Sequence, residues 1–189
     1  VHVSKLIIDP NNNNVFYATT QGATEYTDKV GDGAGVFKSN DRGNSWTQIN
    51  NGLDSLETNI LTVDPNDSET LYLGTDDDGV YKSTDGGESW KKLTVSSLSK
   101  SFGVGDIIVD PQNSNNIYIG TVDYFRLSES RGVLGDFGVY KSTDGGATWE
   151  EFNVGLNHLG VFSLELSEEN RILYAGTRAG GVYWISLDN

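Results

Sequence analysis

Ser83-Thr84-Asp85-Gly86-Gly87-Glu88-Ser89-Trp90 is the stretch that decides the fold, because its pattern occurs twice more, at 39–46 and 142–149. The shared pattern is Ser-x-Asp-x-Gly-x-Ser/Thr-Trp. An Asp and a Gly two residues apart suit a tight hairpin in which the carboxylate accepts backbone N–H groups and the Gly adopts positive φ. We expect the Trp to begin the outgoing strand and to fold back over the turn, which buries its indole. The recurring residues are Ser39, Asp41, Gly43 and Trp46, then Ser83, Asp85, Gly87 and Trp90, and finally Ser142, Asp144, Gly146 and Trp149. Because three such copies stand at repeat spacing, we expect them to be structural rather than catalytic or metal-binding.

These copies belong to a longer repeat. An Asp-Pro pair precedes each one and is followed by a Tyr eight residues after the Asp, and a Gly-Val-aromatic triplet comes next. The Asp-to-Tyr pairs are Asp9 to Tyr17, Asp64 to Tyr72 and Asp110 to Tyr118, and a degenerate fourth unit contains Tyr174. Short β-branched and aromatic runs between Gly, Pro, Asn and Asp predict strands, and no stretch has a helical period. A four-stranded antiparallel unit repeated at roughly 40 to 60 residues is typical of a propeller blade.

The motif and the repeat resemble the Asp box, or BNR repeat, of β-propellers, and the blades are similar to sortilin-type and xyloglucanase-type blades. The resemblance implies an all-β propeller of four Asp-box blades, at about 1–55, 56–103, 104–158 and 159–189 of a single domain. We expect the last blade to be incomplete, because its end lacks the Asp, the Gly and the closing Trp of the box. Three arrangements stay open, namely a compact four-bladed ring, a segment of a larger propeller, and self-association through the open edge of the last blade.

Composition limits the partners. Thirteen basic and 27 acidic residues give a net charge of −14, which argues against nucleic acid and anionic membranes as partners. No apolar run approaches the roughly 20 residues that span a bilayer, so we expect no membrane insertion. The chain has no Met and no signal-peptide pattern, so we interpret it as a processed product or an excised fragment. The absence of Cys excludes disulfides and leaves the redox compartment open.

The loops between the second and third expected strands indicate where a site could lie. They are long at 21–34 and 122–137 and short at 76–78 and 178–180. Long loops on a repeat scaffold usually carry function. Aromatic rings beside carboxylates suit a sugar-binding surface, and the same groups suit a protein interface. Alternatively, the aromatic residues only pin each loop to its blade. The ligand-binding candidates are Tyr26, Asp32, Tyr124, Phe125, Arg126 and Asp136.

Metal binding and nucleophilic catalysis find little support in the sequence. Asp76, Asp77 and Asp78 could bind calcium, which prefers several carboxylates, but turn chemistry alone explains a three-residue hairpin followed by Gly79. The chain has two His and no Cys, so a catalytic triad or a zinc site is not expected. We expect no cofactor, with calcium as the alternative.

The resemblance to known families implies several activities. Sialidases use an arginine cluster and a tyrosine nucleophile, and this chain has few arginines, one of them in a box on the opposite face. Xyloglucanase-like glycoside hydrolases use two aspartates, for which Asp32 and Asp136 are only loosely equivalent candidates. We therefore expect a non-catalytic, extracellular or cell-surface module that contacts a protein or a glycan through loops 21–34 and 122–137. The alternatives are a fragment of a xyloglucanase-like glycoside hydrolase and a self-assembling structural subunit.

Overall fold

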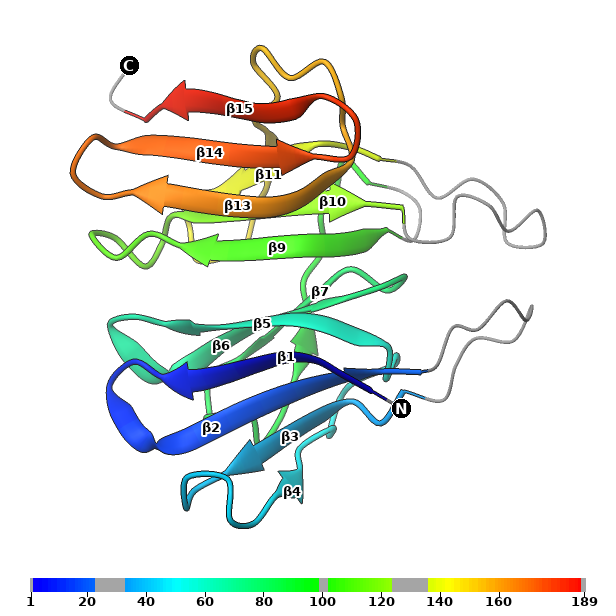
Figure 1. Cartoon of the computed structure of the whole chain (residues 1–189), viewed down its shortest axis with the longest axis vertical. Coiled ribbons are helices and arrows are strands. Elements are labelled where there is room, and N and C mark those ends of the chain that lie inside the picture. The colour runs from blue at the N-terminus through cyan, green and yellow to red at the C-terminus, as the bar shows by residue number, and fades with distance from the viewer. Residues whose placement is uncertain (1, 23–32, 99–101, 124–135, 188–189) are drawn as a thin grey trace.

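The computed structural model describes residues 2–22, 33–98, 102–123 and 136–187, and these residues form four antiparallel sheets with no helix among them (Figure 1). The sheets are called blades 1 to 4 in chain order. Blade 1 consists of β1 (His2–Asp9), β2 (Asn12–Gln21), β3 (Val36–Ser39) and β4 (Thr47–Gln48). Blade 2 consists of β5 (Thr58–Asp64), β6 (Asp67–Thr75), β7 (Val80–Ser83) and β8 (Lys91–Lys92). Blade 3 consists of β9 (Gly103–Val109), β10 (Ile117–Val122), β11 (Val139–Ser142) and β12 (Glu150–Glu151). Blade 4 consists of β13 (Val161–Ser167), β14 (Ile172–Thr177) and β15 (Gly181–Ser186).

The expected all-β fold of Asp-box blades is confirmed, and the described part of blade 4 has three strands and no box. The blades follow one another in a row, with blade 1 and blade 4 at opposite ends of the longest axis (Figure 1). Neighbouring blades touch through their first two strands, because β1 and β2 contact β5, β5 and β6 contact β9, and β9 and β10 contact β13. The structure does not show a closed ring.

The core lies between blades rather than inside one blade. The repeated tyrosines Tyr17, Tyr72 and Tyr118 are almost fully buried at the three interfaces. Between blades 1 and 2 the cluster consists of Tyr17, Val36 and Ile49 from blade 1 and Leu61, Val63, Leu71, Leu73, Tyr81 and Trp90 from blade 2. Each blade therefore covers the sheet face of the next, and its stability depends on its neighbours.

The Asp boxes form the predicted hairpins. In blade 2, Ser89 donates its backbone N–H to Asp85 Oδ1 at 2.9 Å, and Gly87 donates its N–H to Ser83 Oγ at 2.9 Å. Gly87 has a φ of 93°, as the predicted positive φ requires. The boxes of blades 1 and 3 repeat these bonds on Asp41 and Asp144.

The tryptophans depart from the expectation in one blade. Trp90 and Trp149 are buried, and the Trp90 indole N–H donates to the backbone oxygen of Ile49 in the preceding blade at 2.8 Å. Trp46 is 39% exposed, because no blade precedes blade 1 in the described chain. The expectation that every box buries its own indole is therefore wrong for blade 1, since the burial comes from the neighbouring blade.

A lysine of the preceding blade bonds to the box of blade 2 and to the box of blade 3. Lys38 Nζ in blade 1 donates to the backbone oxygen of Gly86 in the box of blade 2 at 2.9 Å, and Lys82 Nζ repeats this bond on Gly145 in blade 3 at 3.0 Å. Lys82 also lies 5.2 Å from the ring centroid of Tyr72. The Asp boxes thus contribute to the interfaces between blades as well as to local turns.

Candidate functional site

The connections between second and third strands all leave the sheets at one end, which we call the loop face, and the strand ends that border them lie on the right of Figure 1. Of the candidate ligand-binding residues, Asp136 lies within the described residues. The others, Tyr26, Asp32, Tyr124, Phe125 and Arg126, lie outside them.

The base of loop 21–34 is held by a residue of the following blade. The carboxylate of Glu57, just before β5, accepts the N–H of Gly22 on Oε2 at 2.8 Å and the N–H of Gly33 on Oε1 at 2.9 Å. Glu57 is buried, so these two bonds satisfy a carboxylate that water does not reach freely. The two ends of the loop are thereby fixed to each other.

The base of loop 122–137 is held by a residue of the loop itself. Asp136 Oδ1 accepts the backbone N–H of Asp123 at 2.8 Å. Gly160 stands where blade 2 has Glu57, and a Cβ added to Gly160 would lie 2.9 Å from Asp136 Oδ2. Asp136 therefore acts as a support of the loop, and its expected partner Asp32 lies outside the described residues.

Between the two loop bases lies a buried acid. Asp76, the first residue after β6, is only 5% exposed. Its Oδ1 and Oδ2 accept the side-chain amide of Gln21 at 2.9 and 3.0 Å, and the same amide contacts Asn59 Oδ1 at 3.2 Å. Burial raises the pKa of Asp76 to about 7, and the negative charges of Glu57 and Asp77 add to this effect while the Gln21 amide opposes it. The carboxyl can therefore gain or lose a proton near neutral pH.

The three adjacent acids have separate partners. Asp77 Oδ1 accepts the hydroxyl of Ser55 at 3.2 Å, whereas Asp78 accepts the hydroxyl of Tyr81 and pairs with Lys92. Among the described residues, no group of three or more His, Cys, Asp or Glu is placed to hold a metal ion. The run 76–78 therefore does not converge on one point in this structure.

Blade 4 contributes a cation and an aromatic ring to the loop face. Arg178, the first residue after β14, donates from Nη2 to the backbone oxygen of Asp123. Its guanidinium lies 5.1 Å from the ring centroid of Phe162 in β13. This contact joins the end of blade 4 to the base of loop 122–137.

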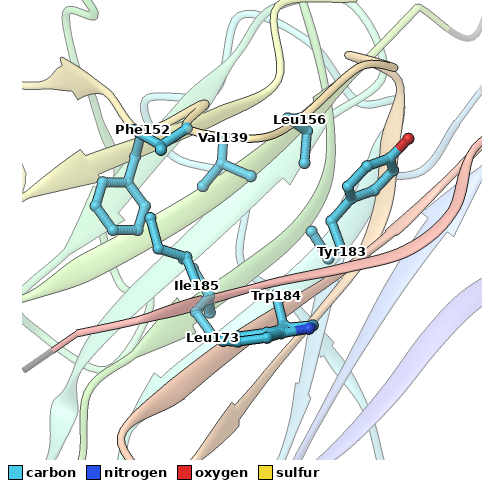
Figure 2. Close-up of a pocket in the computed structure, with 9 residues that line it drawn as sticks. Val139, Phe152, Leu156, Leu173, Tyr183, Trp184 and Ile185 are labelled. Atoms are coloured by element: carbon cyan, nitrogen blue, oxygen red, sulfur yellow. The ribbon is translucent and has the colours of Figure 1, made fainter.

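Two pockets have linings that include none of these loop-base residues. The first, between blades 3 and 4, is apolar and has a volume of about 20 Å³, and Figure 2 shows Val139, Phe152 and Leu156 facing Leu173 and Ile185 across it. That volume holds about one water. The second has a volume of about 500 Å³ between the boxes of blades 2 and 3, but its Lys82 is already bonded to Gly145.

Sequence reasoning missed Gln21 and Glu57 and considered Asp76 only as a metal ligand. A signal was present, because Gln21, Asp76, Val122 and Arg178 occupy the same position, directly after the Thr that ends or nearly ends each second strand. Three of these four residues are polar at the end of an otherwise apolar strand. Polar residues at one repeated position predict a shared polar layer beneath the loops.

Comparison with known proteins places the fold in a family. The model of the Sortilin-Vps10 family, described as sortilin, neurotensin receptor 3, matches residues 34–183. The chain therefore belongs to the Sortilin-Vps10 family of Asp-box propeller proteins.

Xyloglucanases are similar to the chain in sequence and in structure. Xyloglucanase Xgh74A of Acetivibrio thermocellus is 36% identical over 96 residues, which cover 46% of this chain and 11% of the relative. An ancestral GH74 enzyme superposes with a TM-score of 0.75 at 25% identity, covering 96% of this chain and 22% of that one. The GH74 enzyme of Niastella koreensis gives a TM-score of 0.71 at 26% identity, covering 98% and 28%. The chain thus spans about a tenth of the curated relative and about a quarter of each solved structure.

No helix long and apolar enough to cross a membrane occurs in the described parts of the chain.

Proposed function

We propose that this chain is a segment of a xyloglucanase-type propeller and that its loop face contacts a β-glucan chain of the xyloglucan class. The observation that carries the proposal is the match to xyloglucanase Xgh74A at 36% identity, supported by two GH74 structures that cover nearly the whole chain. Fold alone would not support a function, because propellers of one type serve many roles. Contact through a protein partner, as the family name suggests for sortilin, stays the competing prediction.

The geometry of the loop face supports this proposal. Both long loops begin and end at positions fixed by buried or partly buried carboxylates, Glu57 for the first and Asp136 for the second. Loops with fixed bases on a rigid sheet present their side chains with a smaller entropic cost on binding. A propeller face carrying two such loops therefore suits an extended ligand that touches both.

Binding, rather than hydrolysis, is the function we propose for the chain by itself. A general acid must reach the glycosidic oxygen to within hydrogen-bond distance. Asp76 is 5% exposed, and both of its carboxylate oxygens already accept the Gln21 amide. Hydrolysis remains a second candidate because the pKa of Asp76, raised to about 7 by burial, suits the acid of a glycosidase.

The test is affinity electrophoresis of the 189-residue chain in gels that contain xyloglucan, an unsubstituted β-1,4-glucan or an α-glucan. We expect xyloglucan to retard the chain and the α-glucan not to. The double substitution Tyr124→Ala with Phe125→Ala in loop 122–137 should abolish the retardation while the melting temperature holds. Trp46→Ala removes an exposed aromatic residue from the opposite face and serves as the matched control. A folded chain that no β-glucan retards would refute the proposal.

A reducing-end assay on the same glycans distinguishes hydrolysis, the second candidate function, from binding. Release of reducing ends that Asp76→Asn or Asp136→Asn abolishes would establish hydrolysis, whereas binding without release supports the proposed role. We further propose an extracellular or cell-surface location, because a polysaccharide of this size lies outside the cell. Fractionation of the cells that make the full-length protein tests this location.

A further inference from the structure

A cavity of about 500 Å³ lies between the Asp boxes of blades 2 and 3, at the strand ends opposite the loop face. Lys82 and Lys91 of blade 2 line it together with Thr84 and Ser89, and residues 144–147 of blade 3 line its other side. Cavities that bind small organic molecules have volumes of roughly 300 to 1,000 Å³. The size of this cavity therefore suits an organic ligand rather than a lone inorganic ion.

The two lysines lie directly opposite each other in the sheet. Lys82 of β7 pairs with Lys91 of β8. At the same position blade 1 has a Lys-Thr pair and blade 3 has a Lys-Glu pair, namely Lys38 with Thr47 and Lys141 with Glu150. Cross-strand pairs of like charge destabilise a sheet, whereas opposite charges stabilise it. Blade 2 thus places two cations side by side where the other blades place one cation or a cation with an acid.

At the interface between blades 1 and 2, acids accompany the equivalent lysine. Lys38 Nζ and Glu69 Oε2 each lie 3.0 Å from the point where a Cβ on Gly86 would stand, so the cation and the carboxylate lie close together. The box that Lys38 contacts contains a further acid, Glu88. The lysine of blade 1 therefore has negative charges near it within the chain.

Neutral residues take these two positions at the interface between blades 2 and 3. The backbone oxygen of Asn115 accepts the N–H of Gly145 at 3.0 Å, just as that of Glu69 accepts the N–H of the equivalent box glycine at 2.9 Å. Ala147 stands where the box of blade 2 has Glu88. The cavity between blades 2 and 3 therefore has one cation more and two acids fewer than the equivalent position between blades 1 and 2.

The pKa values of the interface tyrosines reflect this difference in charge. Burial raises the pKa of Tyr17, between blades 1 and 2, and three carboxylates raise it further, with Glu69 and Glu88 among them. Burial also raises the pKa of Tyr72, between blades 2 and 3, and among the described residues the charge of Asp64 adds to this effect. Less negative charge therefore surrounds the second interface.

One carboxylate lines the cavity, but its own box already binds it. Asp144 Oδ1 accepts the N–H of Thr148 at 2.8 Å, and Asp144 Oδ2 accepts the hydroxyl of Thr148 at 2.6 Å. Lys82 uses one of its three N–H donors on the Gly145 oxygen. The exposed side chain of Lys91 makes no hydrogen bond or ion pair within the part of the chain that the structure describes. Both lysines therefore have donors left for a ligand.

We propose that this cavity binds an anionic saccharide, with the carboxylate or sulfate group of the sugar between Lys82 and Lys91. The anion relieves the repulsion between the two cross-strand ammonium groups and takes the place of the acids present at the preceding interface. The hydroxyl oxygens of Thr84 and Ser89 can accept hydrogen bonds from sugar hydroxyls. The site is separate from the glycan contact proposed for the loop face, because it lies at the opposite strand ends and requires a charged ligand.

The test is isothermal titration calorimetry of the 189-residue chain at low salt with three related ligands, namely α-1,4-digalactose, its 6-sulfate and digalacturonic acid. None of them is a β-glucan, so the loop face is not expected to bind them. We expect at least one of the two acidic sugars to bind and neutral digalactose not to, and the tighter ligand identifies the charged group. Added salt should weaken the binding. A folded chain that binds neither acid, or binds digalactose equally well, overturns the proposal.

Two variants test the charges of the cavity. Lys91→Thr and Ala147→Glu each introduce the residue that another blade has at that position, so we expect both chains to fold. Each should weaken binding at least about tenfold, as the loss of a charge-assisted hydrogen bond does. Lys92→Thr is the matched control, because it removes the same charge from the next residue, which pairs with Asp78 and does not line the cavity.

Melting temperatures establish that each variant is folded. Binding that survives both cavity variants, or that Lys92→Thr weakens as much as Lys91→Thr does, overturns the proposal. Lys91→Thr should leave the retardation by xyloglucan unchanged, because it lies at the strand ends opposite the loop face. The two proposals can therefore fail independently of each other.

Discussion

The guanidinium of Arg171 in blade 4 donates two hydrogen bonds to the carboxylate of Asp110 in blade 3, from Nη1 to Oδ1 at 3.0 Å and from Nη2 to Oδ2 at 2.6 Å. Asp110 is the Asp of an Asp-Pro pair. At the earlier interfaces a serine hydroxyl of the following blade takes this role, and Ser114 donates to Asp64 at 2.8 Å. Burial works to raise the pKa of Asp110, but the bonds from Arg171 leave it below its usual range. The blade without an Asp box is thus tied to its neighbour by an ion pair.

We expect Arg171→Leu to lower the free energy of unfolding by about 3 to 5 kcal/mol, because it leaves a fully buried carboxylate without its cation. Ser114→Ala, at the equivalent position, should cost only about 1 kcal/mol, since a neutral hydrogen bond is lost. Urea unfolding of both variants measures the difference. Equal losses would show that the ion pair contributes no more than the serine bond.

The lysine ties between blades give a second prediction. Lys82→Met keeps the length of the side chain but removes the bond to the Gly145 oxygen and the contact with the Tyr72 ring. We expect a loss of about 1 to 2 kcal/mol in the free energy of unfolding. Lys91→Met, at an exposed lysine nearby, is the control and should change stability little. Identical melting curves for the two variants would contradict a role for the lysine at the interface.

The Asp boxes predict acid sensitivity. Hydrogen bonds from Ser89 and Ser83 lower the pKa of Asp85 from 3.8 to about 2, and bonds within the other boxes do the same for Asp41 and Asp144. The unfolded chain therefore binds protons at a higher pH than the folded chain, so stability is complete above about pH 4 and is lost as pH falls toward 2. Thermal midpoints measured across this range should fall steeply. Asp144→Asn should make the fall shallower, and an unchanged slope would argue against this origin.

The raised pKa of Asp76 predicts that stability also depends on pH above about pH 4, but in the opposite direction. Its pKa in the folded chain, raised by burial to about 7, exceeds its ordinary value of 3.8, so the folded state binds the proton more tightly than the unfolded state. Stability should therefore fall as pH rises from about 4 to about 7, by at most about 4 kcal/mol. Asp76→Asn should remove this fall and be relatively more stable at pH 8 than at pH 5. Wild-type and variant curves that run parallel would contradict the raised pKa.

The support of loop 21–34 can be tested by local unfolding. Glu57→Ala removes both acceptors of the Gly22 and Gly33 N–H groups, and we expect faster amide exchange at these two glycines. The global free energy of unfolding should fall by about 1 to 3 kcal/mol, because the buried N–H of Gly22 and the partly buried N–H of Gly33 lose their acceptor. Hydrogen exchange followed by mass spectrometry measures the local effect. Unchanged exchange at the loop base would show that other contacts hold it.

The local parts of the fold were predictable. Within an Asp box, the bonds to the carboxylate and to the first hydroxyl join residues at most four apart, such as Ser89 to Asp85 and Gly87 to Ser83, so the residue types within eight positions suffice to predict the turn. The strands followed from short apolar runs between turn residues. The candidate site was not predictable in the same way, because Gln21 and Asp76 are 55 residues apart and meet only when blades 1 and 2 pack.

By itself, the sequence determined the blade type, the number of repeats and the faces on which boxes and loops lie, because these depend on turn chemistry and strand patterning within each repeat. Only the tertiary structure decided that Glu57 holds the loop of the preceding blade, that Asp76 is buried and that the Trp90 indole donates to the backbone oxygen of Ile49. Burial, desolvation and charge proximity depend on which blade lies next to which. The same residue type can therefore be buried in one blade and exposed in another, as Trp90 and Trp46 are in this structure.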